Sequence, residues 1–189
     1  PGPHALPLAT LGSLALLVAV IAVRPPTPVD ETRYLAVAWE MHQSGNWLSL
    51  RLNGALYGHK PPLLFWLINL GWGIFGVNAW WPRLLTGLAG LGALWLLDRL
   101  ARLLAPGRDD LRAMTLLVTA SSLYWMVFTG AVMFDLMLAF FVLLGALGIA
   151  RAGSGAGMRA WLLTGVALGL GILTKGPVAV FFPLVVSLL

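Results

Sequence analysis

The chain has 189 residues, of which 59% are hydrophobic and 10% charged, and its formal net charge is +5 at pH 7. A soluble domain carries about 25% charged residues, so this composition excludes a soluble globular domain and indicates a polytopic membrane protein. The basic residues are dispersed along the sequence, which excludes the clustered basic surface of a nucleic-acid-binding protein. The absence of cysteine excludes disulfides and thiol chemistry.

The first apolar segment covers residues 6–23, LPLATLGSLALLVAVIAV. A hydrocarbon core takes roughly 20 helical residues, so this segment is predicted to be the first membrane span. A secretory signal would carry a basic N-terminal region and a small-residue cleavage site, and the segment has neither. The start at Pro1 and the apolar run at the other end indicate the N-terminal part of a longer protein.

Residues 24–77 are predicted to form a loop on the outer side of the membrane. Within it, residues 30–45 have the sequence DETRYLAVAWEMHQSG, which is typical of an amphipathic helix lying along the membrane surface. Thr27 or Asp30 is expected to cap the start of this helix, and Gly45 is expected to end it.

The end of the loop, residues 61–77, is apolar but short for a span, and it contains Asn69. The arginines of later segments indicate whether residues 61–77 cross the membrane. If this segment does not cross, the arginine-bearing segments 98–112 and 151–159 both face the cytoplasm, as short basic loops do. Residues 61–77 are therefore predicted to be a tilted or re-entrant helix at the outer interface.

Residues 80–189 are predicted to supply the further spans, which brings the total to six, the last one incomplete. Small residues recur at helical spacing at Gly165 and Gly169 and in the segment GLAGLGA, residues 87–93. Such faces allow helices to approach closely in lipid. The predicted spans after the loop are 80–98, two helices within 113–150, 159–173 and a segment beginning at 177.

This topology brings a set of ionisable residues from four separate segments to the outer interface. Unpaired charge at that depth is costly, so the gathering of both signs points to a functional site. The members of the set are Asp30, Glu31, Arg33, Glu40, Lys60, Asp135 and Lys175.

Several of these charges also have a structural interpretation. Asp30 and Glu31 can stabilise the start of the surface helix through its dipole. Asp135 can form a structural ion pair with Arg83 or with Lys175. Both interpretations stay open at the level of sequence.

The stretch NGALYGHKPPLLFW, residues 53–66, places Lys60 directly before a proline. Proline biases the residue before it to an extended conformation, and prolines suit the first turn of the helix that follows. An ammonium group beside a helix N-terminus can bind an anion, so Lys60 is a candidate phosphate ligand. His59 is a candidate metal ligand, although a single histidine suits a surface role equally well.

Six short motifs occur in order along the chain: DETRY, SGNW, NGALYGHKPPL, FGVNAWWPRL, MFD and LTKGP. Together they resemble the protein O-mannosyltransferase-like glycosyltransferases, especially the bacterial aminoarabinose–lipid A transferase branch. The resemblance implies a GT-C fold, an all-α polytopic membrane bundle with amphipathic interfacial helices in the first outer loop. It further implies inverting transfer of a sugar from a polyprenyl-phosphate donor to a lipid A-like or protein acceptor. The reaction would occur at the periplasmic face of the bacterial inner membrane.

The resemblance also implies roles for single residues. Asp30 corresponds to the catalytic base or acceptor-positioning carboxylate, and Asp135 to the second acidic residue of the catalytic site. The aminoarabinose transferases place a metal-binding glutamate where this chain has His59, so a divalent metal stays an open alternative and no cofactor is assigned. Substrate and phosphate binding fall to Glu31, Arg33, Tyr34, Lys60 and Lys175.

Two other functions fit parts of the sequence. The intramembrane Asp135 and the helix break at Gly176 and Pro177 suit the path of a membrane transporter. A transporter of that kind predicts internal repeats and a site at the midplane, whereas these charges gather at one face and no repeat is found. A relative of the transferases that has lost catalytic activity is the second alternative.

Overall fold

The computed structural model describes residues 4–187. Helices dominate this part of the chain, and its two short strands form one antiparallel hairpin. The elements in chain order are α1 (Ala5–Val23), α2 (Asp30–Ser44), β1 (Arg51–Leu52), β2 (Ala55–Leu56), α3 (Leu63–Phe75), α4 (Trp80–Leu104), α5 (Asp109–Ser121), α6 (Leu123–Phe128), α7 (Asp135–Gly153), α8 (Met158–Lys175) and α9 (Val178–Ser187).

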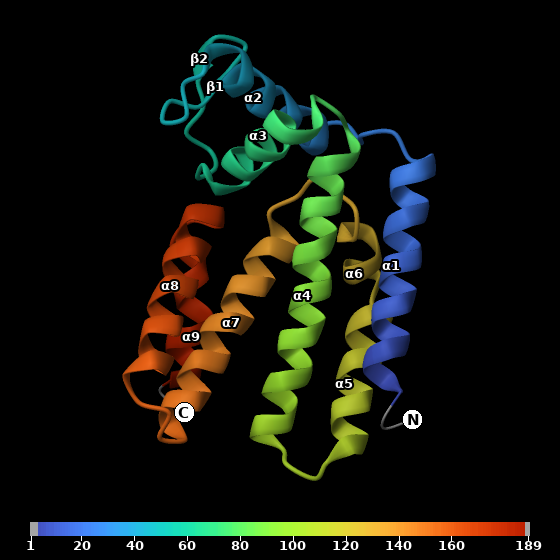
Figure 1. Ribbon diagram of the computed structural model, residues 1–189, viewed down its shortest axis with the longest axis vertical. Helices are drawn as coiled ribbons and strands as arrows, with labels where there is room; N and C mark the ends of the chain where they lie inside the picture. The colour runs from blue at the N-terminus through green and yellow to red at the C-terminus, as the bar shows by residue number, and fades with distance from the viewer. Residues whose placement is uncertain (1–3, 188–189) are drawn as a thin grey trace.

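A helical bundle forms the body of the molecule. Helices α1, α4, α5, α7, α8 and α9 run along its long axis (Figure 1). Helix α7 packs against α4, α8 and α9, while α1 packs against α4 and α5. Among the described helices, α1, α4 and α7 are long and apolar enough to cross a membrane. The all-α membrane architecture predicted from the sequence is therefore confirmed, while the count of six spans stays a prediction.

Close helix contacts depend on small residues, but only partly on those expected. A Cβ on Gly87 or Gly90 would lie within 3.0 Å of leucine side chains of α1 or α7, so the segment 87–93 is a close-contact face as predicted. Within the described residues the prediction for Gly165 and Gly169 is wrong, because a Cβ on either would meet none of them within 4 Å. Those two glycines lie on the face of α8 that is turned away from α7.

Helices α2 and α3 and the hairpin form a cap over one end of the bundle (Figure 1). Helix α2 begins at Asp30 after the N-cap residue Val29, whose side chain makes no capping hydrogen bond. The expected cap by Thr27 or Asp30 is therefore wrong: the N–H of Thr27 donates to Glu31 instead. Gly45 ends the helix as predicted, with a φ of 64°.

The hairpin was not predicted, although its sequence carries a recognisable signal. Asn53 and Gly54 both have positive φ, at 54° and 79°, which is the conformation that an Asn-Gly pair favours in a two-residue hairpin turn. The carboxylate of Glu40 on α2 accepts hydrogen bonds from the N–H groups of both turn residues. This contact fixes the hairpin against α2.

Helix α3 lies across the end of the bundle beside α2 instead of along the bundle axis (Figure 1). The polar residue that made residues 61–77 a poor span is buried between the two helices. The amide of Asn69 donates to the carbonyl groups of Ala38 and Phe65, and its oxygen lies 3.2 Å from Nδ1 of His42. Asn69 therefore links the two cap helices, consistent with the interfacial position expected for this segment.

Candidate active site

An aromatic cluster brings the cap into contact with the start of α7. Phe134 is 1% exposed, and the edge of its ring meets Tyr34 of α2 at a centroid distance of 4.9 Å. The Nζ of Lys60 lies 5.7 Å from the centroid of the same Phe134 ring. Because Phe134 is the N-cap residue of α7, this packing joins a residue of α2 and the lysine of the loop to the start of α7.

Asp135 forms an ion pair between two helices of the bundle. The Nζ of Lys175, the last residue of α8, lies 2.7 Å from Oδ1 of Asp135. The hydroxyl of Tyr124 donates to the same oxygen at 3.1 Å. Gly176 ends α8 with a φ of 84°. Of the two partners that the sequence left open for Asp135, the structure shows Lys175.

Asp30 and Arg33 form an ion pair one turn apart on α2. The guanidinium carbon of Arg33 also lies 5.4 Å from the centroid of the Tyr34 ring. Burial raises the pKa of Tyr34 above its ordinary value, and burial likewise raises the pKa of Tyr57. Both phenols therefore stay protonated at neutral pH and are available as hydrogen-bond donors near the candidate carboxylates.

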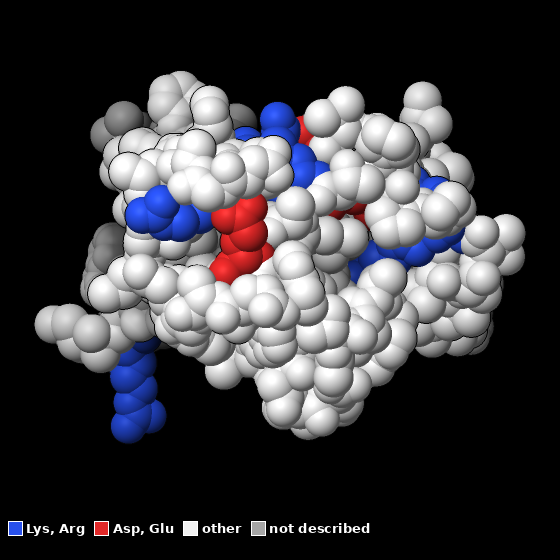
Figure 2. Space-filling view, turned by 90° about the horizontal axis from the view of Figure 1, so that it is seen from above, with Lys and Arg blue, Asp and Glu red and all other residues white. Residues whose placement is uncertain are grey.

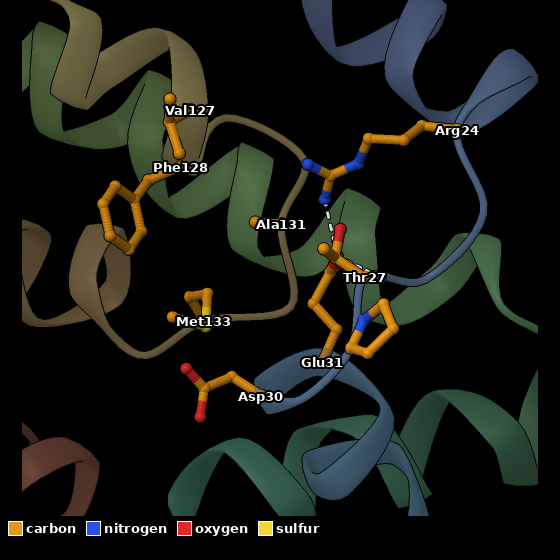
Figure 3. A pocket seen from close by; sticks show the side chains of 9 residues that line it. Arg24, Thr27, Asp30, Glu31, Val127, Phe128, Ala131 and Met133 are labelled. Carbon is orange, nitrogen blue, oxygen red and sulfur yellow. Dashed lines mark hydrogen bonds and ion pairs between the residues drawn. The ribbon is translucent and has the colours of Figure 1, made fainter.

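Glu31 points into the protein, away from its neighbour Asp30 (Figure 3). It is 2% exposed, and its Oε2 accepts from Arg24 at 2.6 Å and from the N–H of Thr27 at 2.9 Å. Its Oε1 accepts from the N–H of Val132 at 2.7 Å and lies 3.8 Å from Nε of Arg83. The carboxylate thus connects the ends of α1, α2 and α4 with the loop before α7.

A cavity of about 160 Å³ lies beside Asp30 at the junction of α1, α2 and α6 (Figure 3). One wall is polar, and the other is formed by side chains of α6 and the loop that follows it. Lys60, Asp135 and Lys175 are not part of this lining. The residues that line the cavity are Arg24, Thr27, Pro28, Asp30, Glu31, Val127, Phe128, Ala131 and Met133.

The cap end of the bundle carries charged groups from segments that are far apart in the sequence. Figure 2, which looks onto this end, shows acidic and basic side chains side by side among uncharged ones. The ion pairs Asp30–Arg33 and Asp135–Lys175 belong to this end. We refer to these four residues together with Tyr34 and Lys60 as the cap-end cluster.

The residues described do not make a metal site. No group of three or more His, Cys, Asp or Glu side chains in this part of the chain is arranged to hold an ion. His59 is exposed, and its ring lies 5.3 Å from that of Tyr57. The contacts seen for His59 are thus those of a surface aromatic side chain, and no chemical step is assigned to a metal.

Sequence reasoning missed several residues that organise this end. Tyr124 and Phe134 contact the predicted site residues directly, while Arg24 and Arg83 hold Glu31. Phe134 lies inside the MFD motif, so the sequence contained a signal that could have identified it. The contact of Tyr124 with Asp135 depends on how α6 folds back, which no local pattern indicates.

A family model described as dolichyl-phosphate-mannose-protein mannosyltransferase matches residues 59–189. The chain belongs to this family. The predicted GT-C relationship is therefore confirmed, and family membership favours a glycosyltransferase over the transporter that parts of the sequence suggested.

Curated relatives and solved structures point to one branch. An undecaprenyl phosphate-alpha-4-amino-4-deoxy-L-arabinose arabinosyl transferase of Pseudomonas fluorescens is 33% identical, over 84% of this chain and 28% of its own length. A transferase of the same name from Pseudomonas aeruginosa is 32% identical over 84% of this chain and 30% of its own length. The crystal structure of ArnT from Cupriavidus metallidurans bound to undecaprenyl phosphate superposes with a TM-score of 0.79 at 28% identity, covering 92% of this chain and 32% of that one.

The chain thus spans about a third of the length of the relatives it matches. The family model covers residues 59–189, and the structural likeness to ArnT covers 92% of this chain.

Proposed function

We propose that the protein containing this chain transfers a sugar from a polyprenyl-phosphate donor to a lipid acceptor, with inversion at the anomeric carbon. The relatives are named for an undecaprenyl-phosphate-linked amino sugar, which makes a donor of that class the first to test. We place the reaction at the periplasmic face of a bacterial inner membrane, at the capped end of the bundle. A protein acceptor, which the resemblance also allowed, is an outcome for the assay to distinguish.

The observation that carries this proposal is the cap-end cluster itself. Carboxylates and basic groups from the cap and from two bundle helices lie at one end of the molecule, where Arg33 contacts Tyr34 and Lys60 contacts Phe134. Transfer from a lipid phosphate requires a group that accepts the proton of the acceptor. It also requires positive charge where the phosphate leaves. The cluster supplies both at one end of a membrane bundle, where a lipid tail can remain in the bilayer.

The chemical step we propose is a single displacement. The acceptor oxygen attacks the anomeric carbon of the donor sugar, and the bond from that carbon to the phosphate oxygen breaks. Asp30, at the edge of the cavity described above, accepts the acceptor proton. Lys60 and Lys175 stabilise the negative charge of the departing polyprenyl phosphate, and Asp135 fixes the Lys175 ammonium through their ion pair.

The role of Asp30 is tested with Asp30→Asn in the full-length protein. Loss of a general base lowers the rate by about 10²–10⁴-fold, so we expect kcat of Asp30→Asn to fall by that amount with a smaller change in KM. The measurement is transfer of labelled sugar from undecaprenyl phosphate to extracted lipid. Asp110→Asn, which changes an exposed carboxylate away from the cap, is the control and should match the wild type. A wild-type rate for Asp30→Asn would remove that residue from the chemistry.

The phosphate contact is tested with Lys60→Met, because Lys60 has no carboxylate partner within the described residues. Removing one group that stabilises developing charge costs about 10²–10³-fold in rate, and we expect kcat/KM to fall within that range. His59→Ala, at the neighbouring exposed position, should have less than a tenth of that effect. Equal losses in the two variants would contradict a specific role for the Lys60 ammonium.

A further inference from the structure

A second group of basic residues lies at the end of the bundle away from the cap. Helices α4 and α7 pack together, and near their ends they border a hollow of about 250 Å³. We call this hollow the arginine pocket. Its lining consists of Arg99, Arg102, Leu103, Leu147 and Arg151.

Helical spacing explains why these residues share one hollow. On α4, Arg99 and Arg102 are three residues apart and Leu103 follows Arg99 by four, so all three lie on one stripe of the helix. On α7, Leu147 and Arg151 are four residues apart. The two stripes meet where the helices pack, so the three arginines and the two leucines line one hollow.

The positive charge of the arginine pocket is not balanced by nearby carboxylates. Arg102 pairs with Asp98 at 2.7 Å, but Asp98 is fully buried and shares its other oxygen with Arg112. Arg99 and Arg151 form no ion pair with any residue that the structure describes. The C-terminal ends of α4 and α7 contribute only about half a negative charge each, which does not neutralise the group.

Membrane orientation alone does not explain this arrangement. Short basic loops keep one end of a membrane protein in the cytoplasm, and Arg108 and Arg159 supply charge of that kind without lining the pocket. Arg108 is also paired with an exposed carboxylate, Asp110, at 3.0 Å. The arginine pocket differs because three arginines line one hollow and two of them, Arg99 and Arg151, form no ion pair within the described residues.

An apolar surface adjoins the pocket. The guanidinium carbon of Arg99 lies 5.0 Å from the centroid of the Trp95 ring. Trp95 is four residues nearer the middle of α4 and is 47% exposed. Tryptophan is enriched where the polar and apolar zones of a bilayer meet. A ligand with an anionic head in the pocket can therefore lay an acyl chain along Trp95 toward the membrane interior.

We propose that the arginine pocket binds the phosphate headgroup of an anionic phospholipid in the leaflet opposite the cap. Arginine presents paired N–H donors that match phosphate oxygens, which makes it well suited to this ligand. Uncompensated positive charge favours a lipid with net negative charge over a zwitterionic one. The hollow is smaller than the roughly 300–1,000 Å³ of a site for a whole small molecule, in keeping with a headgroup whose chains stay in the bilayer.

The test is native mass spectrometry of the full-length protein, titrated in detergent with phosphatidylglycerol or with phosphatidylcholine of the same acyl chains. We expect bound phosphatidylglycerol in the wild type and about 10- to 30-fold weaker binding in the double variant Arg99→Gln, Arg151→Gln, because two basic contacts are lost. The matched control is Arg108→Gln, Arg159→Gln, which removes the same formal charge from two exposed positions outside the pocket. The control should bind within twofold of the wild type.

Three outcomes would overturn the proposal. The first is equal binding of the two lipids by the wild type, and the second is equal binding of phosphatidylglycerol by the two double variants. The third is displacement of the lipid by millimolar inorganic phosphate, which would indicate a site for free anions. If the double variant does not yield folded protein, the single variant Arg151→Gln and the charge-preserving Arg99→Lys, Arg151→Lys replace it. The single variant should lose several-fold in affinity, and the lysine variant should retain most of it.

Discussion

At the scale of single residues, neighbouring carboxylates on α2 have opposite environments. Asp30 lies at the edge of a cavity and pairs with a partly exposed arginine. Glu31 is buried, and both of its oxygens accept hydrogen bonds from the protein. The side chains of consecutive residues on a helix point in different directions, so one can face a substrate while the next holds the scaffold. That Glu31 binds substrate stays a prediction, whereas the structure shows its hydrogen bonds to Arg24, Thr27 and Val132.

Removing the Glu31 carboxylate should destabilise the protein strongly. Glu31→Ala leaves Arg83, 3% exposed, without its counter-charge, and breaking a buried ion pair costs about 3–5 kcal/mol. Thermal unfolding in detergent measures the loss. Asp109→Ala, which removes a 74% exposed carboxylate from a surface ion pair, should cost at most about 1 kcal/mol.

A double variant distinguishes lost charge balance from lost packing. Because the cost in Glu31→Ala comes from the unpaired Arg83 guanidinium, adding Arg83→Met should restore part of the stability. If the double variant is as unstable as the sum of the two single variants, Glu31 and Arg83 do not interact energetically, and Glu31 acts through its contacts with Arg24 and with backbone N–H groups.

At the scale of elements, the contact between α7 and α8 positions the Asp135–Lys175 pair, because each residue lies at one end of its helix. This contact depends on Gly148. A Cβ at that position would lie 2.3 Å from Oγ1 of Thr164 and 3.0 Å from the carbonyl oxygen of Ala160. The backbone oxygen cannot move without shifting the helix, so the close approach requires glycine here.

Gly148→Ala should therefore destabilise the bundle by about 1–3 kcal/mol through overpacking. Unfolding by titration with a denaturing detergent measures this difference. Gly165→Ala, on the open face of α8, is the matched control, and it should be neutral or stabilising by up to about 1 kcal/mol because alanine favours helix over glycine. Equal effects of the two substitutions would show that α7 and α8 do not pack closely through Gly148.

At the scale of the whole molecule, the two ends of the bundle carry different charge arrangements. The cap end pairs carboxylates with amines and guanidinium groups from α2, α7 and α8. The other end has arginines in excess of carboxylates, with Asp98 buried between two of them. A bilayer between these ends would separate a reactive face from a basic face. This separation is what allows the proposed catalytic site and the proposed lipid site to be tested independently.

Much of this organisation could be predicted from the sequence because it depends on local chemistry. Long apolar runs predicted α1 and α4, and Gly45 predicted the end of α2. Ordered motifs predicted the family and the residues of the cap-end cluster. A signal that failed was also local: Thr27 has the chemistry of a helix cap, but its N–H donates to Glu31. Arg24, the residue that follows α1, contacts the same carboxylate.

The sequence by itself determined that the chain is a helical membrane protein, and it predicted charges from separate segments at one end, because burial of apolar surface and the cost of unpaired charge in lipid act on composition and spacing alone. Only the tertiary structure decided which charges pair, that Glu31 faces inward, and that Gly148 and not Gly165 permits close packing. These outcomes depend on the rotation of each helix about its own axis. That rotation is set by contacts between residues distant in sequence, and no local pattern encodes it.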